Sequence, residues 1–202
     1  MKYLTPNSFF RWPPHSFVNI NFVNINLNQF YLTRRNFIPS VKDPQYLDRE
    51  LKKLNIATYG GYGENRKDIW KGTYLDNTQN YYHLGCDINV KKGTEIIAPC
   101  DLNVIDVFKD LDTKIGWGGR IILRKKDGPF IILAHLDPHT ITDQKYIKMG
   151  NPVGKIGTWP TNGNTFEHLH LQLRYTDDFD IMDGYGTEEE LMNNPCPFTT
   201  KI

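Results

Sequence analysis

Short apolar runs separated by turn residues fill the chain from residue 83 to residue 174. The run at 130–133, Phe-Ile-Ile-Leu, is continuous, whereas 168–173, His-Leu-His-Leu-Gln-Leu, alternates strictly. Both patterns predict β-strands. Glycine-containing turns are expected between the runs at residues 92–93, 127–129, 149–151 and 162–164. Strands at this density predict a mainly β fold of antiparallel sheets, arranged as a sandwich or barrel-sandwich with a few short helices outside the core.

Two segments favour helices. Asp43 and Pro44 supply an N-cap and a proline at the first helical position, and the Leu and Tyr spacing that follows forms one apolar stripe. A helix near 44–54 is therefore expected to pack on the core. Residues 187–190 have the Thr-x-x-Glu pattern of a capping box, and Pro195 would end the short helix that follows. We expect no chemistry from that tail.

The segments before residue 83 are less regular. Residues 17–21 and 22–26 are two copies of Phe-Val-Asn-Ile-Asn, too few for a solenoid, and they favour an irregular extension or an edge strand. Residues 59–66 are glycine-rich and predict a loop. The chain is expected to comprise an N-terminal extension at 1–60, a core domain at 61–175 and a C-terminal tail at 176–202.

Composition excludes several classes of partner. The 202 residues include 24 basic and 23 acidic side chains, a balance that does not favour binding to nucleic acid or to an anionic membrane. No run approaches the roughly 20 apolar residues of a membrane span, and the first residues lack the apolar core of a secretory signal. We expect a cytoplasmic protein or export by another route. The three cysteines lack metal-binding spacing and are expected to be buried thiols.

The candidate metal-binding residues are histidines and an aspartate from two separate segments. His83 and Asp87 are four residues apart, and His168 and His170 sit two apart in the alternating segment, so both histidines should face one site. Imidazole and carboxylate are the usual ligands of a catalytic zinc ion, although manganese or nickel also accept them. His135, at the end of another apolar run, lies between the two pairs in sequence. The pattern indicates a site for one zinc ion per chain.

These residues resemble the lysostaphin-type, or LytM-like, zinc endopeptidases, which have the duplicated hybrid motif fold. The resemblance runs in order from about residue 82 to residue 174 and includes six blocks. The blocks are His-Leu-Gly-Cys-Asp-Ile at 83–88, Lys-Gly-Thr-Glu-Ile-Ile-Ala-Pro at 92–99, Gly-Gly-Arg-Ile-Ile-Leu at 118–123, Ala-His-Leu at 134–136, Val-Gly-Lys-Ile-Gly at 153–157, and His-Leu-His-Leu-Gln-Leu at 168–173.

The resemblance implies roles for five residues. His83, Asp87 and His170 would bind zinc, and His135 and His168 would line the metal site. Both flanking histidines are candidates for the general base and for the group that stabilises the oxyanion. It also implies a hydrolase, a metalloprotease that cleaves peptide bonds in peptidoglycan of the bacterial cell wall by metal-activated water. A monomer is expected.

Four further residues are expected to shape substrate binding. A Tyr-x-Glu-x-Arg stretch precedes the metal motif in some members of the family, which suggests that Glu64 and Arg66 shape the cleft, with a structural ion pair as the alternative. Trp159 and Phe166 replace part of the small-residue stretch that the family carries before His-x-His, and they would narrow the cleft. Glu167 stands where the family usually has a small residue, and it should point away from the histidines.

Two other functions stay open. The same scaffold without catalysis could serve as a binding module for cell-wall peptide or another partner, and a peptidase or amidase could act on a substrate outside the cell wall. Residues 92–106 also resemble biotin or lipoyl carrier domains, with Lys148 as an attachment lysine. A carrier domain has no use for three zinc ligands.

Overall fold

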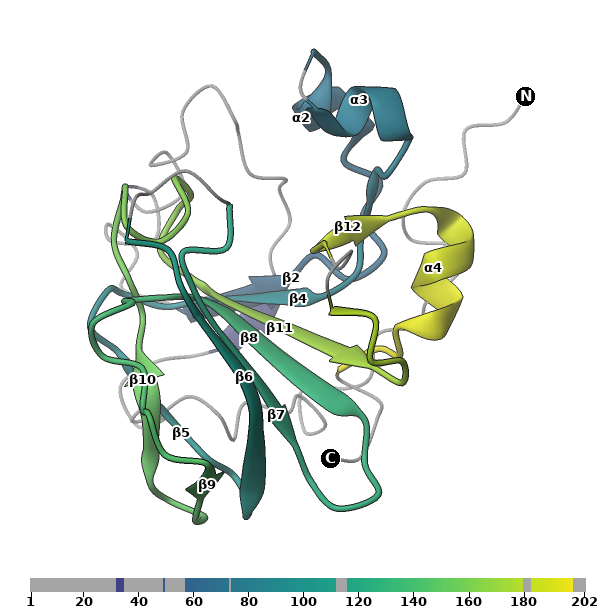
Figure 1. The fold of residues 1–202 in the computed structure, drawn as a ribbon. Coiled ribbons are helices and arrows are strands. Elements are labelled where there is room, and N and C mark those ends of the chain that lie inside the picture. The colour runs from purple at the N-terminus through teal and green to yellow at the C-terminus, as the bar shows by residue number, and fades with distance from the viewer. Residues whose placement is uncertain are drawn as a thin grey trace.

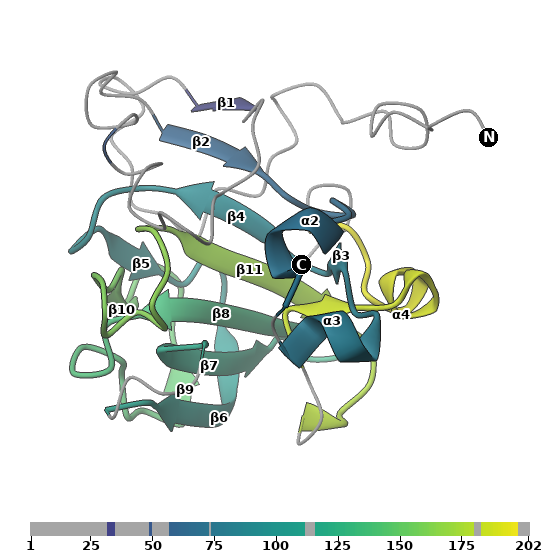
Figure 2. The ribbon, with the colours of Figure 1, turned by 90° about the horizontal axis from the view of Figure 1, so that it is seen from above.

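An eight-stranded sheet forms the centre of the computed structural model, which describes residues 32–34, 49, 57–72, 74–111, 116–179 and 183–197. The strands lie in the order β1-β2-β4-β11-β8-β7-β6-β9, and Figure 2 shows those from β1 to β6 side by side from above. All neighbours are antiparallel except β1 and β2, which are parallel. The strand bounds are β1 Leu32–Arg34, β2 Ala57–Gly60, β4 Cys86–Asn89, β6 Leu102–Lys109, β7 Gly119–Arg124, β8 Phe130–Leu136, β9 Tyr146–Ile147 and β11 Leu169–Arg174.

Smaller elements flank the two ends of this sheet. The β5–β10 pair lies at one end, and the helices lie at the other beside the β3–β12 pair (Figures 1 and 2). Their bounds are β3 Tyr82–His83, β5 Glu95–Ile97, β10 Pro152–Lys155, β12 Tyr185–Gly186, α2 Lys67–Trp70, α3 Tyr74–Thr78 and α4 Glu188–Asn193.

Alternation along β11 gives the sheet two different faces. Leu169, Leu171 and Leu173 are fully buried in the main core, which also includes Ile96 of β5 and Val153 of β10. The residues between these leucines point to the opposite face, because successive side chains on a strand alternate. That opposite face therefore receives His170 and Gln172, and both are buried.

The mainly β, antiparallel architecture with few short helices is confirmed. Among the described strands the main sheet is open, with β1 and β9 as its edges. The expected loop at 59–66 is wrong in its first part, because residues 59–60 belong to β2 and pair with Ile88 and Asp87 of β4. Pairing with a buried neighbouring strand overrides the weak strand propensity of glycine.

Helix α4 begins after Thr187, whose hydroxyl accepts a hydrogen bond from the Glu190 backbone in the expected capping box. The repeat at 17–26 and the helix near 44–54 lie outside the described residues, except for Arg49, which is helical. The boundaries between extension, domain and tail stay a prediction. In the part of the chain that the structure describes, no helix is long and apolar enough to cross a membrane.

The cysteines are free thiols, and Cys86 is fully buried with its Sγ donating to the Gly60 carbonyl oxygen. Cys100 and Cys196 are only partly buried, so the expectation of buried thiols is right for Cys86 alone.

Truncating Ile131, which is fully buried on β8, tests the position of the core. Ile131→Ala is expected to lower the free energy of unfolding by about 2–5 kcal/mol, because it removes transfer energy and leaves a cavity. Ile105→Ala is the matched control, since Ile105 on β6 is 44% exposed, and it should cost less than about 1 kcal/mol. Chemical denaturation of both variants measures the difference, and equal losses would contradict this core.

Candidate metal centre

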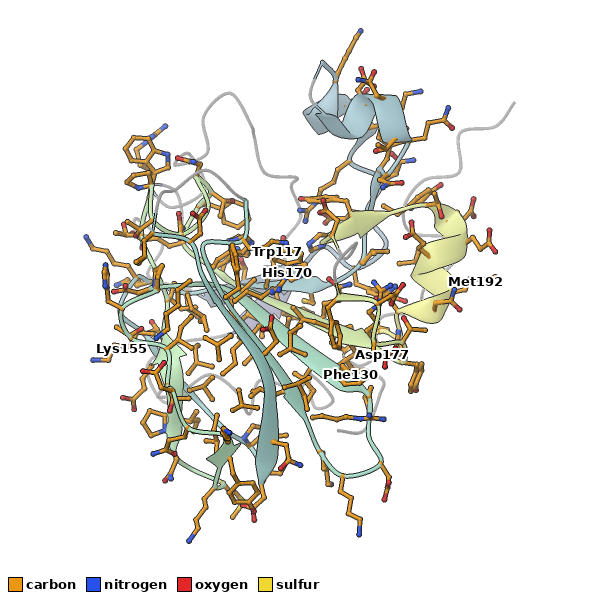
Figure 3. All side chains as sticks on the ribbon, in the orientation of Figure 1. Trp117, Phe130, Lys155, His170, Asp177 and Met192 are labelled. Atoms are coloured by element: carbon orange, nitrogen blue, oxygen red, sulfur yellow. The ribbon has the colours of Figure 1, made fainter. Side chains whose placement is uncertain are left out.

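Three side chains from three strands converge on one point of the sheet's polar face. His83 ends β3, Asp87 lies on β4 and His170 lies on β11. The register places Asp87 and His170 directly opposite each other, so their side chains leave the sheet on the same side. Tyr185 of β12 is the strand partner of His83 and holds it beside Asp87 and His170. Figure 3 shows His170 beside Trp117 on this face.

The three nearest atoms of these side chains form a small triangle. His83 Nε2 lies 3.1 Å from His170 Nδ1 and 3.2 Å from Asp87 Oδ1, and His170 Nδ1 lies 3.6 Å from the same Oδ1. A tetrahedral ion with bonds of about 2.0–2.1 Å separates its ligand atoms by about 3.3–3.4 Å. All three residues are buried. The triangle and its donor atoms therefore fit a divalent metal ion such as zinc.

Arg66 holds the other oxygen of Asp87. Its Nη2 donates to Asp87 Oδ2 at 2.7 Å, and the same guanidinium pairs with Glu64 and donates to the Tyr185 hydroxyl at 2.7 Å. Burial alone would raise the pKa of Asp87, but His83, Arg66 and His168 hold that pKa well below its ordinary value. Asp87 is therefore a fixed carboxylate with its Oδ1 turned to the histidines.

A backbone irregularity places His135. The pairs Gly119 with Leu136 and Ile121 with Leu133 leave two residues of β8 opposite one residue of β7, which is a β-bulge. His135 lies in this bulge with a φ of 64°, a left-handed conformation uncommon for residues other than glycine. Its ring centroid lies 4.3 Å from that of His168 and 6.0 Å from that of His170. The bulge turns a side chain at the end of a core strand toward the metal centre.

In both histidines that flank the triangle, His135 and His168, Nδ1 makes a hydrogen bond with a backbone carbonyl oxygen. His135 Nδ1 lies 2.9 Å from the Asn162 oxygen and His168 Nδ1 lies 2.8 Å from the Phe166 oxygen. A carbonyl oxygen only accepts, so each Nδ1 carries the proton and each neutral ring keeps a lone pair on Nε2. His168 Nε2 lies 3.4 Å from Asp87 Oδ1, at the metal centre. Burial lowers the pKa of both rings, most of all that of His135, where the neighbouring His168 adds to the effect.

Asn162 organises the loop that holds these two rings. Its carbonyl accepts from His135, and its side-chain Nδ2 donates to the carbonyls of Thr165 and Phe166, both at 3.1 Å. The next residue, Gly163, has a φ of 83°, and a Cβ there would collide with the Gly116 carbonyl oxygen. Close packing of two loops around Asn162 therefore fixes the positions of both imidazoles.

The four residues expected at the substrate cleft lie in different surroundings. Arg66 is buried against Asp87, and Glu64 is its partner. Phe166 is also buried and stacks on His168, with ring centroids 4.0 Å apart. Trp159 is 47% exposed. Substrate contact stays a prediction for all four, while the structural ion pair weighed for Glu64 and Arg66 is present.

Several residues of the site were not singled out from the sequence. Trp117 packs edge-on against His170 with centroids 5.6 Å apart, and Tyr185 lies 5.3 Å from the His83 ring. Gln172 and Asn194 join His170 to α4 by hydrogen bonds. Two residues of the tail, where no chemistry is expected, lie near these side chains: Tyr185 contacts the His83 ring, and Asn194 accepts a hydrogen bond from Gln172. Only Gln172 had a signal in the sequence, because it shares the alternating face with both histidines.

The fold and the site define a mainly β protein with a buried His-Asp-His centre flanked by two neutral imidazoles. The chain belongs to peptidase family M23, whose family model matches residues 81–181. Among curated proteins it is 33% identical over 91 residues to the murein hydrolase activator NlpD of Escherichia coli, and 32% identical over 91 residues to that of Salmonella dublin. Each match covers 45% of this chain and 22% of the relative, so the chain spans about a fifth of their length.

Two solved structures show a partial match to this chain. A catalytic-domain mutant of the prophage-encoded M23 protein EnpA from Enterococcus faecalis has a TM-score of 0.42 at 24% identity, covering 58% of this chain and 79% of that one. The catalytic domain of lysostaphin from Staphylococcus simulans has a TM-score of 0.45 at 21% identity, covering 71% and 96%.

Acid is expected to destabilise the metal-free protein. Burial, with Arg66 nearby, lowers the pKa of His83 to about 3, against about 6.5 when unfolded. A depressed histidine pKa means that the unfolded chain binds the proton more tightly, so stability is lost as pH falls below about 6.5. Asp87 acts in the same direction at lower pH, because its folded pKa is also depressed.

Denaturation in EDTA between pH 7.5 and 5 measures this effect. His83→Gln is expected to reduce the pH slope by up to about 1.4 kcal/mol per pH unit, the contribution of one proton. A slope that is flat, or that is unchanged by the substitution, would contradict the assigned state of His83.

Proposed function

We propose that this protein is a zinc-dependent endopeptidase that hydrolyses peptide bonds in peptidoglycan. The observation that carries the proposal is the triangle of His83 Nε2, Asp87 Oδ1 and His170 Nδ1, with edges of 3.1–3.6 Å, beside two imidazoles. Three protein ligands leave the fourth position of a tetrahedral ion for water or substrate, as in catalytic zinc sites. Membership of peptidase family M23 supports the same reaction class.

His83, Asp87 and His170 would hold the ion. When bound there, zinc would lower the pKa of a water molecule and polarise the substrate carbonyl. The other steps fall to His135 and His168, whose Nδ1 protons are committed to backbone carbonyls. A neutral ring can take the proton of the attacking water on Nε2, and a protonated ring can donate it from the same atom.

Proton transfer in this reaction uses both the neutral and the protonated form of imidazole. One imidazole accepts the water proton as the C–O bond forms, and the proton passes to the amide nitrogen as the C–N bond breaks. The other imidazole, when protonated, donates a hydrogen bond to the oxygen that gains negative charge. The charge of one ring lowers the pKa of its neighbour, so the two rings do not carry the extra proton at the same time.

The substrate is proposed from the relatives rather than from the site. Curated proteins that are similar to part of this chain include murein hydrolase activators. Their description also supports a second candidate, a protein that binds peptidoglycan or a hydrolase through this domain without cleaving a bond. The two functions differ in turnover, which an assay measures directly.

Replacing the auxiliary histidines separates catalysis from metal binding. His135→Gln and His168→Gln are each expected to lower kcat by about 10²–10⁴-fold, the usual contribution of general acid–base catalysis, while zinc content stays near one per chain. His139→Gln is the control, because His139 is exposed on the turn after β8. New amino groups released from purified peptidoglycan and from short peptides give the rate.

The outcomes distinguish the candidates. Zinc-loaded protein that releases amines and loses this activity in both variants supports the peptidase. Stoichiometric zinc without turnover on any substrate would overturn hydrolysis and favour the binding protein. Wild-type rates in His135→Gln and His168→Gln would overturn the roles given to those residues.

A further inference from the structure

A chain of buried amides runs from the end of α4 to the ligand His170. Asn194 Nδ2 donates to the Glu190 carbonyl at 2.7 Å, and Gln172 Nε2 donates to Asn194 Oδ1 at 2.9 Å. Gln172 Oε1 lies 3.1 Å from His170 Nε2. Gln172 is fully buried and Asn194 is 1% exposed. These groups lie on the side of His170 away from the proposed metal.

The direction of every hydrogen bond in this chain of amides follows from the first bond, which is made to the Glu190 carbonyl. The Glu190 carbonyl can only accept, so Asn194 must present Nδ2 to it and Oδ1 to Gln172. Gln172 must then present Nε2 to Asn194, which leaves Oε1 for His170. An amide oxygen also only accepts, so His170 carries its proton on Nε2. The lone pair of the neutral ring is thereby on Nδ1, the atom of the ligand triangle.

Packing holds both ends of this chain in place. The Tyr62 hydroxyl donates to the Asn194 carbonyl at 2.8 Å, and the capping box of Thr187 and Glu190 orders the start of α4. At the other end, a Cβ on Gly85 would lie 2.5 Å from His170 Cε1, so the ring is closely enclosed. Met192, on the outer side of the same helix, is 81% exposed (Figure 3). Helix α4 thus presents its buried side to the centre.

We propose that Gln172 and Asn194 are positioning residues, which keep His170 in its Nε2–H tautomer with Nδ1 directed at the metal. The C-terminal segment is thereby part of the metal centre, although it contributes no ligand. The inference rests on the proposed metal site. Partners that orient a ligating histidine commonly change metal affinity by 10–100-fold when they are removed.

Substitutions of Gln172 separate positioning from filling space. Gln172→Met keeps the volume of the side chain but removes the acceptor, so it should weaken zinc binding by about 10–100-fold. Gln172→Glu keeps an acceptor for His170 Nε2–H but loses the donor to Asn194 Oδ1, so it should keep the Nε2–H tautomer and weaken zinc binding less than Gln172→Met does. Asn194→Ala releases the orientation of Gln172 and should weaken binding in the same direction as Gln172→Met, but less.

Two measurements are needed on each variant. Competition with a chromophoric chelator gives the zinc dissociation constant, and long-range ¹H–¹⁵N spectra of the metal-free protein show which nitrogen of His170 carries the proton. Met192→Ala is the control for a change in helix α4, since Met192 is 81% exposed on the outer side of the helix and takes no part in the amide chain. It should change neither the tautomer nor the zinc affinity.

The spectra and the affinities test different claims. An Nε2–H signal for His170 in the wild type that is lost in Gln172→Met and kept in Gln172→Glu would support the positioning role, even if zinc failed to bind and the proposed function fell. An Nδ1–H tautomer in the wild type would overturn it. Wild-type zinc binding that is equally tight in Gln172→Met would also overturn it, while leaving the proposed peptidase intact.

Discussion

Asp87 is a carboxylate without exposed surface, and each of its oxygens has a different set of neighbours. A buried charge is costly unless it is paired and hydrogen-bonded, and Arg66 provides both on Oδ2. Oδ1 is thereby left facing three imidazoles. Breaking the pair with Arg66 would leave an uncompensated charge in the centre, at a cost of about 3–5 kcal/mol. The pair therefore fixes both the charge and the direction of the central carboxylate.

Register in the main sheet places Asp87, His170 and Ala134 in line across β4, β11 and β8. The bulge formed by Ala134 and His135 then brings in His135, and the β3–β12 pair brings in His83. Segments from before and after these strands then close the centre. Arg66 arrives from the loop after β2, and the C-terminal segment adds Tyr185 and Asn194. Because binding to the folded state alone adds stability, a metal held here would tie these distant segments together.

The sequence was most informative where function depends on local spacing. The alternation at 168–173 predicted a strand with both histidines on one face, and His83 and Asp87 stood out by their four-residue spacing. The capping box at Thr187 is equally local. Contacts between distant segments leave no such pattern, so the link from Asn194 to His170 and the place of Trp117 beside the same ring could not be predicted. The end of the β-strand at 57–60 was missed because its last two residues begin the glycine-rich segment 59–66, and their pairing with β4 outweighs that composition.

Backbone conformation explains why the placement of His135 could not be predicted from the sequence. His135 ends an apolar run. In an unbroken strand, alternation alone would decide which face of the sheet its side chain occupies, whatever the position of the metal centre. The bulge and the positive φ that direct it there depend on pairing with β7 and on the close loops around Asn162. Such features follow from tertiary packing, in which the local sequence has only a small part.

A crystal of the protein grown with zinc and measured at the zinc absorption edge would show whether these three side chains bind the ion. One anomalous peak per chain is expected about 2.0–2.2 Å from His83 Nε2, Asp87 Oδ1 and His170 Nδ1, with no cysteine sulfur among the ligands. A peak elsewhere, or full occupancy of zinc at cysteine or surface sites with none at this triangle, would contradict this expectation.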